Sequence, residues 1–349
     1  MSYSSTVLLV IAVTVAAVFF ALLVWYERRR TRAARLDMAA YPGLVRINRW
    51  TLGLRYAGVA VGLVAIPVAA GMGRLGAGVV IAPVVLACAI EAGVIVGEVV
   101  CFRAAREPGV AGLERRTVGR YLEWPLVVLL GLAALCVAVL SVWGWRLAWL
   151  DGRSFRVSAV VGGEDLCSSG ASPFFGPYYS RPIGLALGAA VVLAVVAMAV
   201  VVRRPRNGGD PVLAAWDDAL RRRSARAVAA ALLGAWSATL AIAAVGLLGG
   251  QQTAQAYASG LPAWCQRDLG PLTSRSSVDP PLGAFGHPAM AILLMALGLA
   301  GVVLALISAA MVLADFAPDP SGTEAIASAA VAEPAERRLE GAPTAEARP

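Results

Sequence analysis

Two acidic residues inside an apolar stretch are the positions best suited to chemistry in this chain. Glu91 and Glu98 are the only charged residues between Gly76 and Val100. They are seven residues apart, so on a helix they lie about 20° apart and form an acidic stripe that ends at the membrane edge. A charge near the centre of a bilayer costs at least ~2.5–3.5 kcal/mol, so Glu91 should face protein or water, or be protonated.

The acidic stripe has two interpretations. In the first, Glu91 and Glu98 form a path for a proton or a cation, which would make the protein a small-solute or ion transporter. In the second, Glu98 pairs with an arginine at the inner leaflet and Glu91 makes one buried hydrogen bond. The sequence favours the second interpretation and leaves the first open. The polar candidates for contact with Glu91 on other predicted helices are Thr14, Ser237, Thr239 and Ser308.

Two cysteines are candidates for a disulfide. Cys167 and Cys265 each lie in one of two long loops, which we predict to be on the outer, oxidising side of the membrane. A bond between them would join two loops with little core of their own and would typically add ~2–4 kcal/mol. The sequence has no C-x-x-C motif, so we predict a structural rather than a redox role. The other three cysteines, which fall within or beside apolar segments, are expected to act as small apolar residues: Cys88, Cys101 and Cys136.

Composition excludes several kinds of chemistry. All 30 residues counted as Lys or Arg are arginines, so the chain has no phosphate-binding loop lysine and no Schiff-base lysine. A single histidine, His287, excludes the H-E-x-x-H metalloprotease motif and most histidine-ligated metal centres. We expect His287 to be an interfacial polar residue. The sequence therefore predicts no catalytic residue, no metal site, no bound cofactor and no enzymatic activity.

The elements that must position these residues are transmembrane helices. The 349-residue chain is 59% hydrophobic and 15% charged, whereas soluble domains are about 45–50% apolar and about 25% charged. Apolar segments long enough to cross a bilayer of ~30 Å predict an all-α bundle of seven transmembrane helices. Their approximate ranges are 6–25, 51–72, 76–100, 122–145, 183–202, 227–249 and 288–314.

Arginine counts predict the orientation of the bundle. With the N-terminus outside and the C-terminus inside, 23 arginines lie on the cytoplasmic side and 7 on the outer side, as the positive-inside rule requires. This distribution explains the net charge of +8 without nucleic acid as a partner. The inner arginine clusters are expected to meet anionic lipid headgroups. Segment 6–25 has no basic residues before it, so we interpret it as a retained membrane anchor rather than a cleaved signal peptide.

Four further segments complete the predicted organisation of the chain, in which the transmembrane domain covers residues 1–315. The outer loops 146–182 and 250–287 have similar lengths and one cysteine each, which suggests a diverged duplication of two helical hairpins as a hypothesis. Residues 211–226 predict an amphipathic helix that lies at the inner surface and runs into the next span near Arg226. It begins after Asp210 and is supported by the Asp217–Arg221 and Asp218–Arg222 pairs. The tail 316–349 is rich in Ala, Pro and Glu and is predicted to be disordered.

Four glycines predict how the second and third spans pack. Gly58 and Gly62, and Gly93 and Gly97, form two G-x-x-x-G spacings at similar depth, which would let the two helices approach closely. Gly93 and Gly97 lie nearly opposite to Glu91 around the helix. Arg55 shares the glycine face, so it should not reach Glu91.

Three runs resemble segments of uncharacterised multi-span membrane proteins from high-GC actinobacteria. They are Val96-Gly97-Glu98, the stretch Pro173–Pro182 and the stretch Asp217–Arg222. The resemblance covers about residues 90 to 230 and implies a bacterial source but no activity. The sequence thus predicts a multi-pass protein of the cell membrane with a non-enzymatic structural, sensory or accessory role, whose partners are the lipid bilayer and another membrane protein.

Overall fold

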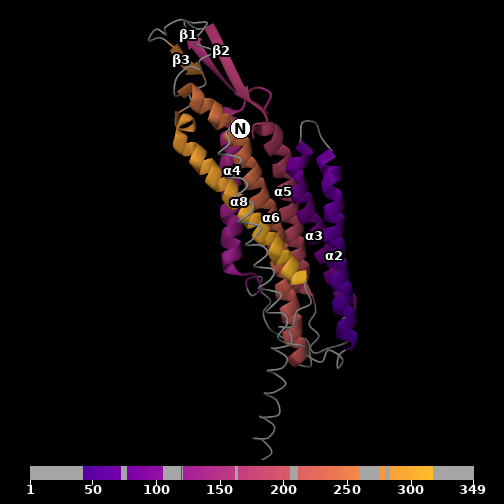
Figure 1. Cartoon of the computed structure of the whole chain (residues 1–349). Coiled ribbons are helices and arrows are strands. Elements are labelled where there is room, and N and C mark those ends of the chain that lie inside the picture. Colours follow the sequence, from indigo (N-terminus) through magenta and orange to yellow (C-terminus); the bar gives the residue numbers. More distant parts are fainter. Residues whose placement is uncertain are drawn as a thin grey trace, which may run out of the picture.

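The structure is a computed structural model of the whole chain. It describes residues 42–71, 77–104, 119, 121–161, 164–204, 211–258, 276–279 and 283–316. Within these ranges, six helices are long and apolar enough to cross a membrane. They are α2 (Pro42–Gly71), α3 (Ala77–Ala104), α4 (Trp124–Leu147), α5 (Pro177–Arg203), α6 (Pro211–Ala258) and α8 (Pro288–Phe316). They form one elongated bundle with a small sheet at one end (Figure 1).

Six of the seven predicted spans are therefore confirmed as helices. The predicted first span, 6–25, and almost the whole predicted tail, 316–349, lie outside the described residues. Proline marks the start of most of these helices: it is the first residue of α2, α5, α6 and α8, and it is the second residue of α4. Proline suits a helix start because its missing N–H would have no partner there and its φ is already helical.

Helix α6 is continuous, as the sequence predicts, but the surroundings of its first part differ from the prediction. The predicted surface helix 211–226 runs without a break into the predicted span 227–249, and together they form one helix of 48 residues. Neither proline nor glycine occurs between residues 212 and 233, so nothing in the sequence interrupts the helix there. Arg221 and Ser224 are fully buried, so this part of α6 packs against protein. The expectation that it lies flat on the membrane surface is wrong.

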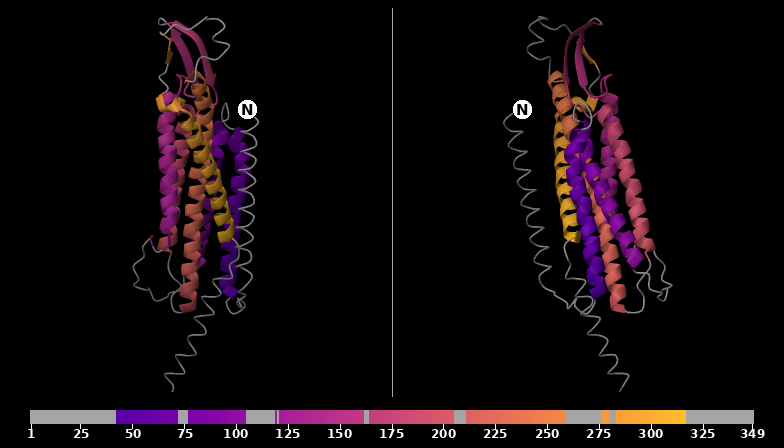
Figure 2. Two further views of the ribbon diagram at one scale, coloured as in Figure 1. Left: turned by 60° about the vertical axis from the view of Figure 1, so that its left-hand side comes forward. Right: turned by 90° about the vertical axis from the view of Figure 1, so that its right-hand side faces the viewer.

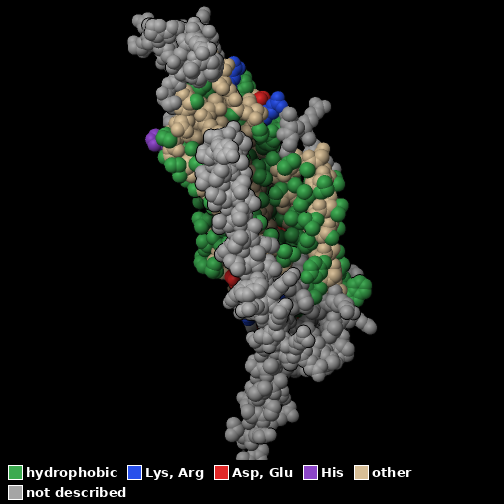
Figure 3. Space-filling model, viewed as in Figure 1, with side chains coloured by type: hydrophobic (Ala, Val, Ile, Leu, Met, Phe, Trp, Pro, Cys, Tyr) green, Lys and Arg blue, Asp and Glu red, His purple; other side chains and the backbone are tan. Residues whose placement is uncertain are grey.

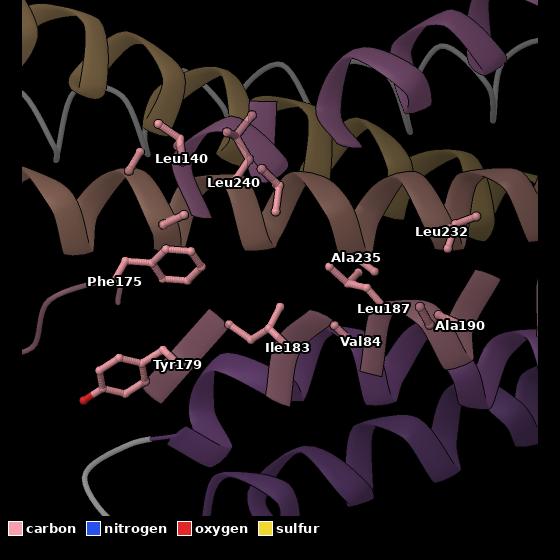
Figure 4. Close-up of a cluster of buried hydrophobic side chains, with 14 of the residues drawn as sticks. Val84, Leu140, Phe175, Tyr179, Ile183, Leu187, Ala190, Leu232, Ala235 and Leu240 are labelled. Atoms are coloured by element: carbon pink, nitrogen blue, oxygen red, sulfur yellow. The ribbon is translucent and has the colours of Figure 1, made fainter. Parts of the chain in front are cut away.

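The core of the bundle lies around α6. Of the most apolar stretch of α6, 72% is buried, whereas in the other five membrane-length helices the buried share is 17–33%. Side chains from α3, α4 and α5 pack on α6, and Figure 4 shows Val84, Ile183, Leu187 and Ala235 in this layer. Two turned views show the other helices standing around α6 (Figure 2).

Glycines bring α2 and α3 into close contact, as the sequence predicts. A Cβ added to Gly58 would lie 2.7 Å from the Ala89 carbonyl oxygen, and one added to Gly93 would lie 3.0 Å from the Gly58 Cα. A Cβ on Gly62 would lie 2.6 Å from Leu86 Cδ1. Gly97 is less restricted, since its Cβ would lie 3.6 Å from the Thr51 carbonyl oxygen, an ordinary contact distance. The predicted close approach of the two helices is confirmed, but only Gly58 and Gly93 face each other, since Gly62 faces Leu86 and Gly97 faces Thr51.

A three-stranded antiparallel sheet joins the two long loops, and the sequence analysis did not predict it. β1 (Phe155–Val161) and β2 (Glu164–Ala171) form a hairpin with a bulge at Ala159/Val160, and β3 (Ser276–Asp279) pairs with the other edge of β1. The alternation of buried Phe155 and Val157 with exposed Arg156 is a strand signal that the sequence carries. The described parts of the two loops differ in structure, so they give no support to the duplication hypothesis.

Aromatic rings attach the sheet to the bundle. Phe155 lies 5.5 Å from Phe174 and 5.5 Å from Phe285, measured between ring centroids, and Phe285 lies 5.9 Å from Trp143 of α4. Gly144 of α4 lets the backbone of Phe175 lie directly against the helix, because a Cβ at Gly144 would lie 1.9 Å from the Phe175 carbonyl oxygen. The end of the bundle that carries the sheet is called the sheet end below.

Candidate functional site

A cluster of charged side chains lies inside the bundle at the end opposite to the sheet. We call it the ionic cluster and define it as Arg55, Glu98, Arg204, Asp217 and Arg221. Each of these side chains is 6% exposed or less. The cluster comes from α2, α3, the residue after α5, and α6, so it joins four segments that are distant in sequence.

Glu98 is bonded to two arginines. Its Oε1 lies 3.1 Å from Arg55 Nη2, and its Oε2 lies 2.7 Å from Arg204 Nη1. The Ser224 hydroxyl accepts a hydrogen bond from Arg55 and donates one to Glu98. The prediction that Glu98 pairs with an arginine is confirmed. Arg55 forms its ion pair with Glu98, so the prediction that it does not reach Glu91 also agrees with the structure.

Arg221 connects the second carboxylate to the end of α5. Its Nη2 lies 2.7 Å from Asp217 Oδ2, which confirms the predicted i,i+4 pair, and Arg204 also pairs with Asp217. Arg221 donates to backbone carbonyls at the end of α5: Val201 (3.1 Å), Val202 (3.3 Å) and Arg204 (2.8 Å). The last carbonyls of a helix lack partners within it and carry partial negative charge, so a guanidinium there is favourable.

The ionic cluster holds helices together and leaves little free for a ligand. Three guanidinium groups face two carboxylates, and their bonds connect α2, α3 and the end of α5 to one another and to α6. Arg55 Nε has no hydrogen-bond partner among the described residues. Arg55, Arg204 and Arg221 are buried in protein, so these three do not face lipid headgroups; for the other inner arginines, contact with headgroups stays a prediction. The role of Arg204 and Arg221 depends on how α5 and α6 pack, which the sequence pattern does not give.

Glu91 has different surroundings from Glu98. It is fully buried on the face of α3 that also carries Ala87 and Val94, one heptad, or about 10 Å, from Glu98 along the helix. Neither of its carboxyl oxygens has a hydrogen-bond partner within the part of the chain that the structure describes. The predicted single hydrogen bond of Glu91 is therefore wrong for the described residues.

The polar residues proposed as partners of Glu91 bond elsewhere or lie outside the described residues. Thr239 donates to the Ala235 carbonyl at 2.8 Å, and Ser308 donates to the Leu304 carbonyl at 2.7 Å, each within its own helix. The Ser237 hydroxyl is buried without a described partner. Thr14 lies outside the described residues. Hydroxyl groups on helices bond readily to the carbonyl four residues earlier, which is why Thr239 and Ser308 are not available.

The cysteines and the histidine show no catalytic arrangement in the described ranges. Cys167 is half-buried on β2 and is not a free thiol, whereas Cys88 and Cys136 are free. Cys265 lies outside the described residues, which contain no two cysteines bonded to each other. The Cys167–Cys265 pairing thus stays a prediction. His287 is exposed before α8, and its Nδ1 accepts a hydrogen bond from the Ala289 N–H at 3.2 Å.

Neither a metal site nor a similar protein points to a function. The described residues contain no group of three or more His, Cys, Asp or Glu side chains that could hold a metal ion. No family model, curated protein or solved structure matches the chain. The function must therefore be argued from the ionic cluster, from Glu91 and from the sheet.

Proposed function

We propose that this chain is a seven-span protein of the cell membrane, with its N-terminus outside, and that its role is structural, sensory or accessory rather than enzymatic. Six membrane-length helices and the apolar segment 6–25 support the span count. The arginine distribution supports the orientation, which places the ionic cluster on the cytoplasmic side and the sheet outside.

The observation that carries this proposal is the mutual pairing of the buried charges. A transport pathway needs polar groups that face a water-filled cavity near the membrane midplane. Here Glu98 is bonded to Arg55 and Arg204, and Asp217 is bonded to Arg204 and Arg221. These groups fix the relative positions of α2, α3, α5 and α6, which favours a rigid scaffold.

The sheet end is the surface that such a scaffold would present to a partner. At the turn between α4 and β1, Leu150 is 95% exposed and the neighbouring Trp149 is 42% exposed. A photo-cross-linking residue at position 150, activated in intact cells, should give one adduct of discrete mass. The same residue at Val139, which is 54% exposed on the apolar side of α4, should give only lipid adducts. The absence of a protein adduct at position 150 would contradict an accessory role of the sheet end.

The second candidate function is transport of protons or cations through Glu91. One observation favours it, namely that both carboxyl oxygens of Glu91 are buried without a described partner. An ionisable side chain inside a membrane costs free energy of insertion, and such residues often line the pathway of a proton or another ion.

A flux assay separates the two functions. With purified protein in liposomes under a pH gradient, our proposal predicts the same proton flux for the wild type, for Glu91→Gln and for protein-free liposomes. Glu91→Gln should also leave the yield of folded protein nearly unchanged. A flux that the wild type shows and that Glu91→Gln loses, with normal folding, would establish the transporter instead.

A further inference from the structure

An apolar hollow opens on the side of the bundle between α2 and α8. Its volume is about 320 Å³, roughly ten times the share of one water molecule in the liquid. Leu63 of α2 and Val312 and Leu313 of α8 line its walls. α2 and α8 make few direct contacts, so neither helix closes the hollow.

The floor of the hollow suits a helix. α6 contributes small residues to it, among them Ala231, Gly234 and Ala238. Small residues let a second helix backbone approach closely, and interfaces between membrane helices are enriched in them. Ser308 also lines the hollow, but its hydroxyl is bonded to the Leu304 carbonyl. The occupant must therefore be apolar and needs no polar partner.

We propose that residues 6–25 of the same chain form a transmembrane helix that packs in this hollow. The segment has 20 residues without a charge, which as a helix is about 30 Å long. The side chains that line the hollow are apolar except for Ser308, and hydrophobic side chains cover much of the described surface between the two ends of the bundle (Figure 3).

The connection to α2 places this segment beside the hollow. Only residues 26–41 separate it from the start of α2 at Pro42, and they can reach at most ~55 Å when extended. This reach lets the segment enter the membrane beside α2, which forms one wall of the hollow. A tethered helix has a high effective concentration at such a site compared with a separate protein. Bulky side chains such as Leu9 and Phe19 could fill space above the small residues of α6.

Depth matching selects residues for a cross-linking test. Trp25 and Trp50 are both predicted at the inner membrane boundary, and Ala12 and Leu63 each lie thirteen residues from their tryptophan. Single cysteines at positions 11 to 14 cover one helical turn, and each is paired with Leu63→Cys. The pairs are introduced into a parent variant in which Cys88, Cys101 and Cys136 are replaced and Cys167 and Cys265 are kept. Pairs with Val139→Cys on α4 serve as matched controls, because Val139 is exposed but does not line the hollow.

The proposal predicts a cross-link within one chain for one or two of the four positions, detected as a joined peptide pair by mass spectrometry. The Val139 pairs should give none. Ala238→Phe fills the hollow and should lower the cross-linking yield several-fold. Val192→Phe, on an exposed position of α5, should not change it.

Two results would overturn the proposal. Cross-links that form only between two co-expressed, differently tagged chains would assign the hollow to a second copy. The absence of any cross-link in folded protein would leave lipid chains as the occupant. The proton flux assay does not depend on either result, so this inference and the proposed function can fail separately.

Discussion

Glu91 and Glu98 show how much of a site the residue pattern can predict. Their burial and their common face on α3 follow from apolar neighbours and a seven-residue spacing. The pairing of Glu98 with an arginine follows from its place near the arginine-rich end. The identity of Arg204 as a partner does not follow, because it depends on where α5 ends relative to α6. For Glu91, the sequence could not show that Thr239 and Ser308 are used within their own helices.

Glu98→Gln tests the strength of the ionic cluster. The amide keeps the shape of the side chain but leaves Arg55 buried without a described carboxylate partner, while Arg204 keeps Asp217, which it shares with Arg221. Removing one partner of a buried ion pair costs ~3–5 kcal/mol, so we expect a loss of that size in the free energy of unfolding, measured in mixed micelles.

The control for this variant is Arg226→Gln. It breaks the Arg226–Glu123 pair, in which the side chains are 40% and 56% exposed, and an exposed pair is worth ~0–1 kcal/mol. Equal small losses for the two variants would contradict a stabilising role for the ionic cluster.

Asp151, at the sheet end, gives a pH-dependent prediction. Desolvation raises the pKa of its carboxyl, but hydrogen bonds donated by Arg153 and Ser154 outweigh this effect and hold the pKa below its usual value. A carboxyl whose pKa is lower in the folded state stabilises the fold above its unfolded pKa of about 4, and this contribution is lost as the pH falls through the folded value.

Asp151→Asn should therefore lower the thermal unfolding midpoint at pH 7. The difference from the wild type should shrink progressively below about pH 4. A difference that stays constant down to the lowest pH at which the wild type remains folded would show that the carboxylate charge is not the cause.

At the scale of elements, helices could be predicted from the sequence and the strands were missed. A helix that spans a membrane is encoded by a long local apolar run, whereas β3 has four residues and exists because it pairs with β1 across the end of the bundle. The continuity of α6 across Arg226 follows from the sequence. The burial of its first part does not, because Arg221 and Ser224 are buried through contacts with the distant segments α5 and α3.

Gly58→Ala tests the close packing of α2 on α3. Its Cβ would lie 2.7 Å from a backbone oxygen, which cannot move without shifting α3. We expect a lower free energy of unfolding for this variant than for the wild type.

Gly184→Ala is the matched control, because Gly184 and Gly188 repeat the same spacing on α5 and a Cβ at either meets nothing within 4 Å. It should be neutral or stabilising by up to ~1 kcal/mol through helix propensity. Equal destabilisation by both substitutions would show that the spacing, and not the contact, is what matters.

At the scale of the whole molecule, amino-acid composition predicts the class of protein. It does not predict how segments distant in sequence pack against one another. Low charge and long apolar runs identify a membrane protein. The central position of α6, the joining of two loops in one sheet and the hollow between α2 and α8 all depend on contacts between distant segments. In the proposed seven-span topology, the sheet and the ionic cluster lie on opposite sides of one membrane.

The most direct test of this account is the labelling of single cysteines in right-side-out membrane vesicles with a maleimide that does not cross the membrane. Leu150→Cys, beside the sheet, and Ser4→Cys, before the first apolar segment, should be labelled from outside. Arg222→Cys, on an exposed position of α6, should be labelled only after the vesicles are permeabilised. Labelling of position 222 from outside, or of positions 4 and 150 on opposite sides, would contradict the proposed seven-span topology.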